Sequence, residues 1–262
     1  MSLTRIKGMI LQELFITKRS LEVFFDIFFF SLMTTIVFGL VSVYLTSKIN
    51  PSSAHFLFIG ILLMEIIRIA QYSTSTGVLW NIWARNLSNL FISPLSITEY
   101  MIAQMLSGTI KSLFTFSLIS MLAAVLFNFN ILNVGLLNLF LFYINLVIFA
   151  WSFGIFVLGL IFRYGTRIQS LAWGLIFVIQ PLTAAFFPIE VLPKPIQSIS
   201  NLLPPTHIFE AARGNLINPS TNWAQLGIAS FENIILFILS LYFFKIMFNK
   251  SKETGQFARN EG

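Results

Sequence analysis

Residues 134–161 read VGLLNLFLFYINLVIFAWSFGIFVLGLI, a run without one charged side chain. A helix rises 1.5 Å per residue, so about 20 apolar residues cross the roughly 30 Å of hydrocarbon in a bilayer. This run exceeds that length. It therefore predicts a transmembrane helix, and it determines how the rest of the chain is interpreted.

The composition of the whole chain supports the same conclusion. Of its 262 residues, 56% are hydrophobic and only 10% are charged, and the mean hydropathy is +0.84. Soluble domains carry about 25% charged residues. Because so little charge cannot cover a water-soluble particle, we expect an all-α integral membrane protein.

Six segments in all are long and apolar enough to span a membrane. They lie at residues 23–45, 54–73, 101–127, 134–161, 171–187 and 225–247. The fifth segment is the shortest and continues directly into a proline-rich stretch. No soluble domain or clear repeat remains, so we expect residues 1–262 to form one transmembrane domain.

Lys and Arg are distributed unevenly between the two sides of these predicted spans. With the N-terminus inside, the inner segments hold Arg5, Lys7, Lys18, Arg19, Arg85, Arg163, Arg167, Lys245, Lys250, Lys252 and Arg259, and the outer segments hold Lys48, Lys194 and Arg213. Because cytoplasmic loops are enriched in Lys and Arg, this bias predicts a multi-pass protein of the inner or plasma membrane with both termini in the cytoplasm. The net charge of +6 lies at span ends and not in a basic stripe, so nucleic acid is not an expected partner.

Residues 1–22 predict an interfacial amphipathic helix. Its apolar positions fall near helical spacing, and its cations lie elsewhere around the helix; the apolar positions are Leu3, Ile6, Met9, Ile10, Leu14 and Phe15. Such a helix would bury its apolar side among acyl chains and turn its cations toward lipid headgroups. A disordered basic leader is the alternative.

Residues 80–100, between the second and third spans, predict a short helix on the cytoplasmic surface. The surrounding stretch of about thirty residues begins STSTGVLWNIW at Ser73 and is neither apolar enough to span nor polar enough to be a disordered linker. Trp80 and Trp83 suit a membrane interface. Pro94 interrupts the helical pattern, and Ser96 or Thr98 together with Glu99 can begin the next helix. A connector without a role of its own is the alternative.

Residues 188–222 lie on the predicted outer side, and five prolines between residues 188 and 205 exclude one continuous helix. These are Pro188, Pro193, Pro195, Pro204 and Pro205. The residues between them keep helical periodicity, which predicts two short re-entrant helices at the outer leaflet. Non-helical backbone is tolerated at that depth only against protein or a wet cavity. We therefore expect this segment to pack on the rest of the protein or to line an exit.

Ionisable and amide side chains inside the predicted spans need partners. Glu65 and Arg68 are three residues apart on one helix face, so they can form a salt bridge that is either purely structural or lines a pathway. Lys111 can pair with a carboxylate of another helix or extend to the interface. Asn138 and Asn145, seven residues apart, can hydrogen-bond a neighbouring helix.

Motifs for several catalytic chemistries are missing from the sequence. It contains no G-x-x-x-x-G-K-[ST] phosphate-binding loop, no H-E-x-x-H and no cysteine, and His55 and His207 stand alone on outer loops. We therefore expect no catalytic residue and no metal site. If ATP drives this protein, another chain must bind it.

Two segments resemble the permeases of ABC type-2 exporters. One is ARNLSNLFISPLSITEYMIAQML, with Pro94 and Glu99. The other begins IFRYGTRIQSLAW at Ile161 and is marked by Arg163, Gly165, Ala172, Trp173, Pro181, Phe187, Pro188, Leu192, Pro193, Leu203, Pro204, Glu210 and Arg213. With the plan of six spans, the similarity covers nearly the whole chain.

The resemblance implies a homodimeric permease domain that works with two ATPase subunits, which bind the ATP and magnesium. It implies that the loop after the second span is a coupling helix, with Trp83, Arg85, Asn86, Leu87, Pro94 and Glu99 as coupling residues. Glu65, Arg68, Lys111, Asn138 and Asn145 are the pathway candidates, and Pro188, Glu190, Pro193, Pro204, Glu210 and Arg213 form the outer gate segment. The family's substrates include lipids, glycans and drugs, and the sequence does not choose among them.

Two other functions stay open at this point. A membrane enzyme that modifies lipids or glycans would need a cluster of carboxylates or histidines, whereas the loops offer only the scattered Glu190, His207 and Glu210. A carrier driven by an ion gradient often has inverted repeats with interrupted spans in both halves. Here the interruptions lie near one outer end of the chain.

Overall fold

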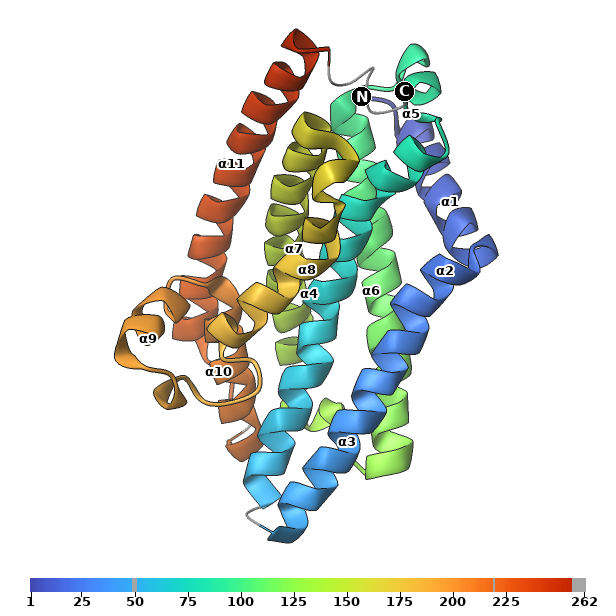
Figure 1. The fold of residues 1–262 in the computed structure, drawn as a ribbon. Helices are drawn as coiled ribbons and strands as arrows, with labels where there is room; N and C mark the ends of the chain where they lie inside the picture. Colours follow the sequence, from blue (N-terminus) through green and yellow to red (C-terminus); the bar gives the residue numbers. More distant parts are fainter. Residues whose placement is uncertain (49–50, 219, 256–262) are drawn as a thin grey trace.

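The computed structural model describes residues 1–48, 51–218 and 220–255. Arg259, one of the cations assigned to the cytoplasmic side, lies outside these residues. The described residues form a bundle of helices without a strand, which confirms the all-α class (Figure 1). In chain order the elements are α1 (Leu3–Arg19), α2 (Leu21–Phe24), the π-helical η1 (Phe25–Phe29), α3 (Phe30–Lys48), α4 (Pro51–Trp83), α5 (Leu87–Ile92), α6 (Ile97–Phe127), η2 (Ile131–Val134), α7 (Leu136–Tyr164), η3 (Gly165–Ile168), α8 (Gln169–Ile179), η4 (Gln180–Thr183), η5 (Ile189–Val191), α9 (Lys194–Ser200), α10 (Pro204–Ile217) and α11 (Trp223–Glu253).

Five helical stretches of the described residues are long and apolar enough to cross a membrane, which identifies a multi-pass membrane protein. They are Leu21–Thr46, His55–Trp83, Ile97–Phe127, Leu136–Thr183 and Trp223–Glu253. The count of six spans is not confirmed, because the expected fifth span, 171–187, is only α8 and η4. With 11 residues, α8 is about 17 Å long, too short to cross alone. It turns back from the end of α7 and stops part-way along the bundle (Figure 1).

Helix α4 is the central helix of the bundle. In its most apolar window 83% of the residues are buried, against 22% for α11. The helix continues to Trp83, ten residues beyond the predicted end of the second span at residue 73. The hydroxyls of Thr74 and Thr76 donate to carbonyls of their own helix, one turn back, at 2.8 Å each. Because these polar side chains are satisfied within the helix, they can be buried between α6 and α7.

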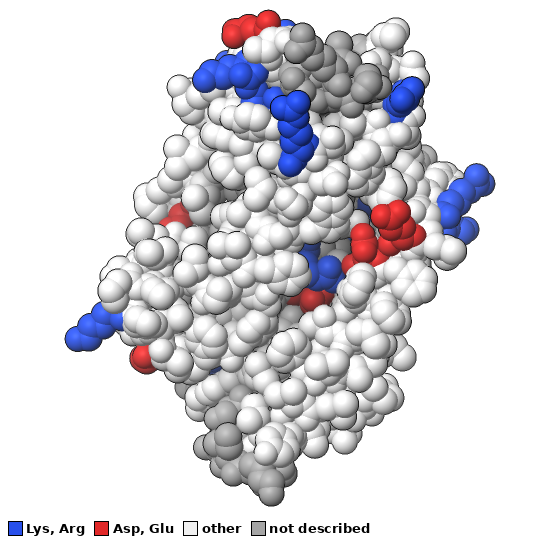
Figure 2. All heavy atoms as spheres, viewed as in Figure 1, with Lys and Arg blue, Asp and Glu red and all other residues white. Residues whose placement is uncertain are grey.

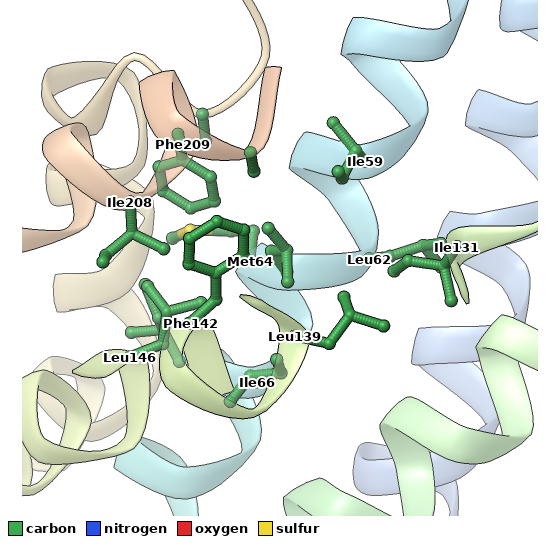
Figure 3. Close-up of a cluster of buried hydrophobic side chains, with 14 of the residues drawn as sticks. Ile59, Leu62, Met64, Ile66, Ile131, Leu139, Phe142, Leu146, Ile208 and Phe209 are labelled. Atoms are coloured by element: carbon green, nitrogen blue, oxygen red, sulfur yellow. The ribbon is translucent and has the colours of Figure 1, made fainter. Parts of the chain in front are cut away.

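The core joins the outer segment to the bundle. Figure 3 shows Ile208 and Phe209 of α10 close to Phe142 of α7 and Met64 of α4, all of them buried. Helix α10 begins with Pro204, whose fixed φ and missing N–H suit the first turn of a helix. The expectation that this segment packs on the rest of the protein is therefore confirmed for α10.

Helix α1 packs along α6 through one face, and the start of α1 and the end of α11 lie at the same end of the bundle (Figure 1). Ile6, Met9, Glu13 and Thr17 are buried, whereas Leu3 and Phe15 are exposed. Some apolar side chains of this helix therefore pack inside the protein, and others face its surroundings. Its place at a membrane interface stays a prediction.

Candidate functional site

A cavity of about 480 Å³ lies between α3, α4 and α8, beside η1. Most of its lining is apolar or aromatic, but it also contains three charged side chains. Figure 2 shows it as a hollow with blue and red atoms in an otherwise mostly white face. Its lining residues are Asp26, Phe30, Thr34, Phe38, Met64, Glu65, Arg68, Gln71, Tyr72, Ala172, Trp173, Ile176, Phe177, Gln180 and Phe186.

The predicted salt bridge between Glu65 and Arg68 lies in this cavity. Arg68 Nη2 is 2.6 Å from Glu65 Oε2, and Arg68 Nε lies 3.1 and 3.0 Å from the two carboxylate oxygens. Ser31 of α3 joins the pair: its hydroxyl donates to Glu65 Oε2 at 2.7 Å and accepts from Arg68 Nη2 at 2.6 Å. The two charges neutralise each other and also fasten α3 to α4.

The π-helical turn η1 brings Asp26 to the same cavity. The N–H of Phe30 bonds to Phe25 O, five residues back, and not to the carbonyl of Asp26. That carbonyl accepts from Arg68 Nη1 at 3.3 Å, and the Asp26 carboxylate accepts from Tyr72 Oη at 2.8 Å. Such π-helical turns inside α-helices are frequent at functional sites. The sequence did not indicate this contact, because no residue pattern predicted the π turn.

The turn that follows η4 closes one end of the cavity. Phe186 stacks on Phe38 with ring centroids 5.8 Å apart. A Cβ atom added to Gly60 of α4 would lie 1.8 Å from the carbonyl oxygen of Ala185, so only glycine permits this approach of helix and turn. Ala184, just before it, has a φ of 51°, which turns the chain away from the direction of α8.

A second polar cluster holds α1 against the α5–α6 corner. Ser96 caps α6, and its hydroxyl and the Glu99 carboxylate form a capping box, as Ser96 Oγ accepts from Glu99 N and Glu99 Oε2 accepts from Ser96 N. Glu99 Oε1 also accepts from Arg5 Nη2 at 2.7 Å and from the N–H of Ser2 at 2.6 Å. Arg5 donates to Pro94 O as well. The buried Glu99 side chain therefore positions this corner from inside.

The other predicted coupling residues surround α5. Leu87 is buried in a cluster with Ile6, while Trp83 and Arg85 are exposed. Arg85 ends α4 with a φ of 52°, and Asn86 N donates back to Asn81 O at 2.8 Å. A short helix is thus present within residues 80–100, and its contact with an ATPase stays a prediction.

Lys111 of α6 pairs with a carboxylate that the sequence did not suggest. Its Nζ is 3.5 Å from Glu13 Oε2 of α1, and Gln104 Nε2 donates to Glu13 Oε1 at 2.9 Å. Both charged side chains are almost fully buried, at 5% and 3% exposure. One sequence feature could have indicated this partner. Glu13 is the single acidic residue in the helical stripe that faces α6, which consists of Ile6, Met9, Glu13 and Thr17.

The two asparagines of α7 contribute to helix packing. Asn145 Oδ1 accepts from Asn233 Nδ2 of α11 at 3.1 Å and from Ser230 Oγ at 3.1 Å, so it forms the cross-helix bond expected for it. Asn138 Nδ2 donates to Val134 O in its own segment. Neither asparagine, nor Lys111, is among the residues that line the cavity.

In the outer segment, Glu210 and Arg213 form a salt bridge of 2.6 Å, and both side chains also bond to the backbone of neighbouring turns. Glu210 Oε1 accepts from Ile189 N, and Arg213 Nη1 donates to Ala185 O. Pro188, Pro193 and Pro204 each stand at the start of η5, α9 or α10, and Glu190 is exposed.

The expectation that His207 stands alone is wrong. Its Nδ1 lies 2.6 Å from Gln225 Oε1 and its Nε2 lies 3.5 Å from Glu232 Oε1, so it joins α10 to α11. The sequence placed Glu232 in the last span and could not show that α10 folds back beside it. Among the described residues, no group of three or more His, Asp and Glu side chains is arranged to hold a metal ion.

The fold and this cavity define a class: a multi-pass membrane protein with a charged cavity between its spans. The family model described as ABC-2 type transporter matches residues 5–217. Since this match covers most of the 262 residues, the chain belongs to the ABC-2 type transporter family and is a membrane component of such a transporter. A search of curated proteins finds no match.

Proposed function

We propose that this chain is the permease subunit of an ATP-driven exporter, moving a lipid-like, drug-like or glycan substrate outward while a separate ATPase subunit hydrolyses ATP. The family match over residues 5–217 carries this proposal. The sequence contains no phosphate-binding loop, which supports a partner chain that binds ATP and magnesium. In this proposal both termini are cytoplasmic, and the chain itself performs no catalysis.

The ATPase would dock on the corner made by α1, α5 and the start of α6. Arg85 and Trp83 are exposed there, and Glu99 ties the start of α6 to α1 through Arg5. Because the corner is tied to α6 by buried contacts, a push on α5 is transmitted to the bundle. Arg85 would contact the partner, and Glu99 would position the corner.

The substrate path would run past the cavity between α3 and α8, closed by a second copy of the chain. Phe30 and Phe177 at its edge are 54% and 64% exposed, which supports an opening toward such a partner. Glu65 and Arg68 would exchange partners as the path opens. A Glu65→Gln, Arg68→Gln double variant that assembled and transported normally would remove this role.

Co-purification tests the proposed function. The tagged chain is purified from the membranes of its native cells, and a P-loop ATPase is expected to co-elute and to hydrolyse ATP faster in the complex. Arg85→Glu should weaken the complex, whereas Lys194→Glu, an exposed lysine on α9, is the matched control. No co-eluting ATPase would count against the permease role, and an intact, active Arg85→Glu complex would count against docking at α5.

A further inference from the structure

The cavity between α3, α4 and α8 has an unbalanced charge. Asp26, Glu65 and Arg68 are the charged residues that line it, so two carboxylates face one guanidinium and one formal negative charge is left over. Figure 2 shows red atoms beside the hollow as well as in it. A buried or half-buried charge in such apolar surroundings needs a partner.

The excess charge belongs to Asp26. Arg68 uses Nε and Nη2 on Glu65 and Ser31, and it reaches the Asp26 backbone and not its carboxylate. Among the described residues no ion pair joins the Asp26 carboxylate to a cation. The carboxylate accepts a hydrogen bond from the hydroxyl of Tyr72. Asp26 is only half-buried, so a ligand can approach it.

Gln71, which also lines the cavity, carries an acceptor without a donor among the described residues. Gln71 is 1% exposed and uses its amide nitrogen on Ser75 Oγ and on Ala172 O. Its Oε1 is buried with no hydrogen-bond partner in the described part of the chain. A buried acceptor without a donor is unfavourable, so a ligand that reached this atom with an N–H or O–H group would satisfy it.

The rest of the lining is suited to a ligand that is largely apolar and carries a positive charge. Phe30, Phe38, Trp173, Phe177 and Phe186 supply aromatic rings, whose faces attract cations. A volume of about 480 Å³ lies within the usual range for small-molecule sites, which is roughly 300–1,000 Å³. An anionic ligand is unfavourable here, because it would compete with Glu65 for Arg68. Without Arg68, the Glu65 carboxylate, which is 6% exposed, would keep only the Ser31 hydroxyl as a donor.

We infer that this cavity binds a lipophilic amine in its protonated form, with the Asp26 carboxylate as its counter-ion and the aromatic side chains around its body. This inference rests on the proposed function and names its substrate class. It selects a drug-like organic cation over an anionic lipid or a glycan.

Dye binding to the full-length chain in lipid nanodiscs tests this inference without ATP or an ATPase. Rhodamine 6G, a cation with N–H groups, and fluorescein, an anion with a similar fused-ring body, are titrated and followed by fluorescence anisotropy. We expect saturable binding of rhodamine 6G only. Asp26→Asn should weaken it by about tenfold or more, since it removes the counter-ion but keeps the size. Glu253→Gln, at an exposed carboxylate at the end of α11, is the matched control and should bind as the unaltered chain does.

Three results would overturn the inference: fluorescein binding as tightly as rhodamine 6G, no saturable binding of either dye, or unchanged rhodamine binding by a folded Asp26→Asn variant. Each of these leaves the co-purification of an ATPase unaffected. Conversely, if the chain binds rhodamine 6G through Asp26 but associates with no ATPase, the inferred ligand class stands and the proposed exporter function is wrong.

Discussion

The buried ion pair between Glu13 and Lys111 gives the sharpest prediction about stability. The two side chains come from α1 and α6, and Lys111 Nζ lies 3.5 Å from Glu13 Oε2 with almost no access to solvent. Removing one partner of a buried pair leaves the other charge uncompensated, at a cost of about 3–5 kcal/mol. Glu13→Gln and Lys111→Met should therefore each lower the free energy of unfolding by about that amount.

The double variant distinguishes pairing from simple loss of packing. With both charges gone no charge is left unpaired, so Glu13→Gln with Lys111→Met should cost less than the sum of the single changes by about 2 kcal/mol. The assay is equilibrium unfolding in mixed micelles, followed by tryptophan fluorescence. Lys7→Met, at an exposed lysine of the same helix, is the control and should stay within about 0.5 kcal/mol. Additive single effects, or single effects as small as the control, would refute the pairing.

Three further changes test the packing of the turn after η4, of α7 against α11 and of α1. Gly60→Ala places a Cβ 1.8 Å from Ala185 O, so it should lower stability by about 1–3 kcal/mol in the same unfolding assay, and a neutral result would mean that this turn does not lie against α4. Asn145→Leu removes the acceptor of Asn233 and should cost about 1–2 kcal/mol, whereas an unchanged midpoint would contradict the α7–α11 bond. Glu99→Gln should speed proteolysis of α1, because it weakens the bond to the guanidinium that docks this helix, and equal cleavage rates would argue against that tie.

Features that depend on neighbouring residues could be predicted from the sequence. Ser96 and Glu99 are three residues apart after Pro94, and they form the capping box that begins α6. The outer prolines likewise stand at the starts of short helices, because proline suits only the first turn. Glu65 and Arg68 pair because positions three apart share a helix face.

Features that depend on tertiary contacts could not be predicted. Glu13 and Lys111 are 98 residues apart, and no local pattern connects them. The hydroxyl-rich start of STSTG suggested a loop, yet it is helical because its side chains bond to their own backbone. The apolar stretch 171–187 suggested a full span, but Pro181 and the turn at Ala184 shorten it to α8.

The orientation of the bundle is the most direct test of the proposed function, because the proposed ATPase can reach only a cytoplasmic α5. The chain has no cysteine, so a single cysteine can be introduced at Asn89 of α5 or at Ser198 of α9, both exposed, and labelled in intact cells with a membrane-impermeant maleimide. We expect Ser198→Cys to be labelled from outside and Asn89→Cys to be labelled only after the cells are opened, as the proposed orientation requires. Labelling of both positions in intact cells, or of Asn89→Cys alone, would contradict it.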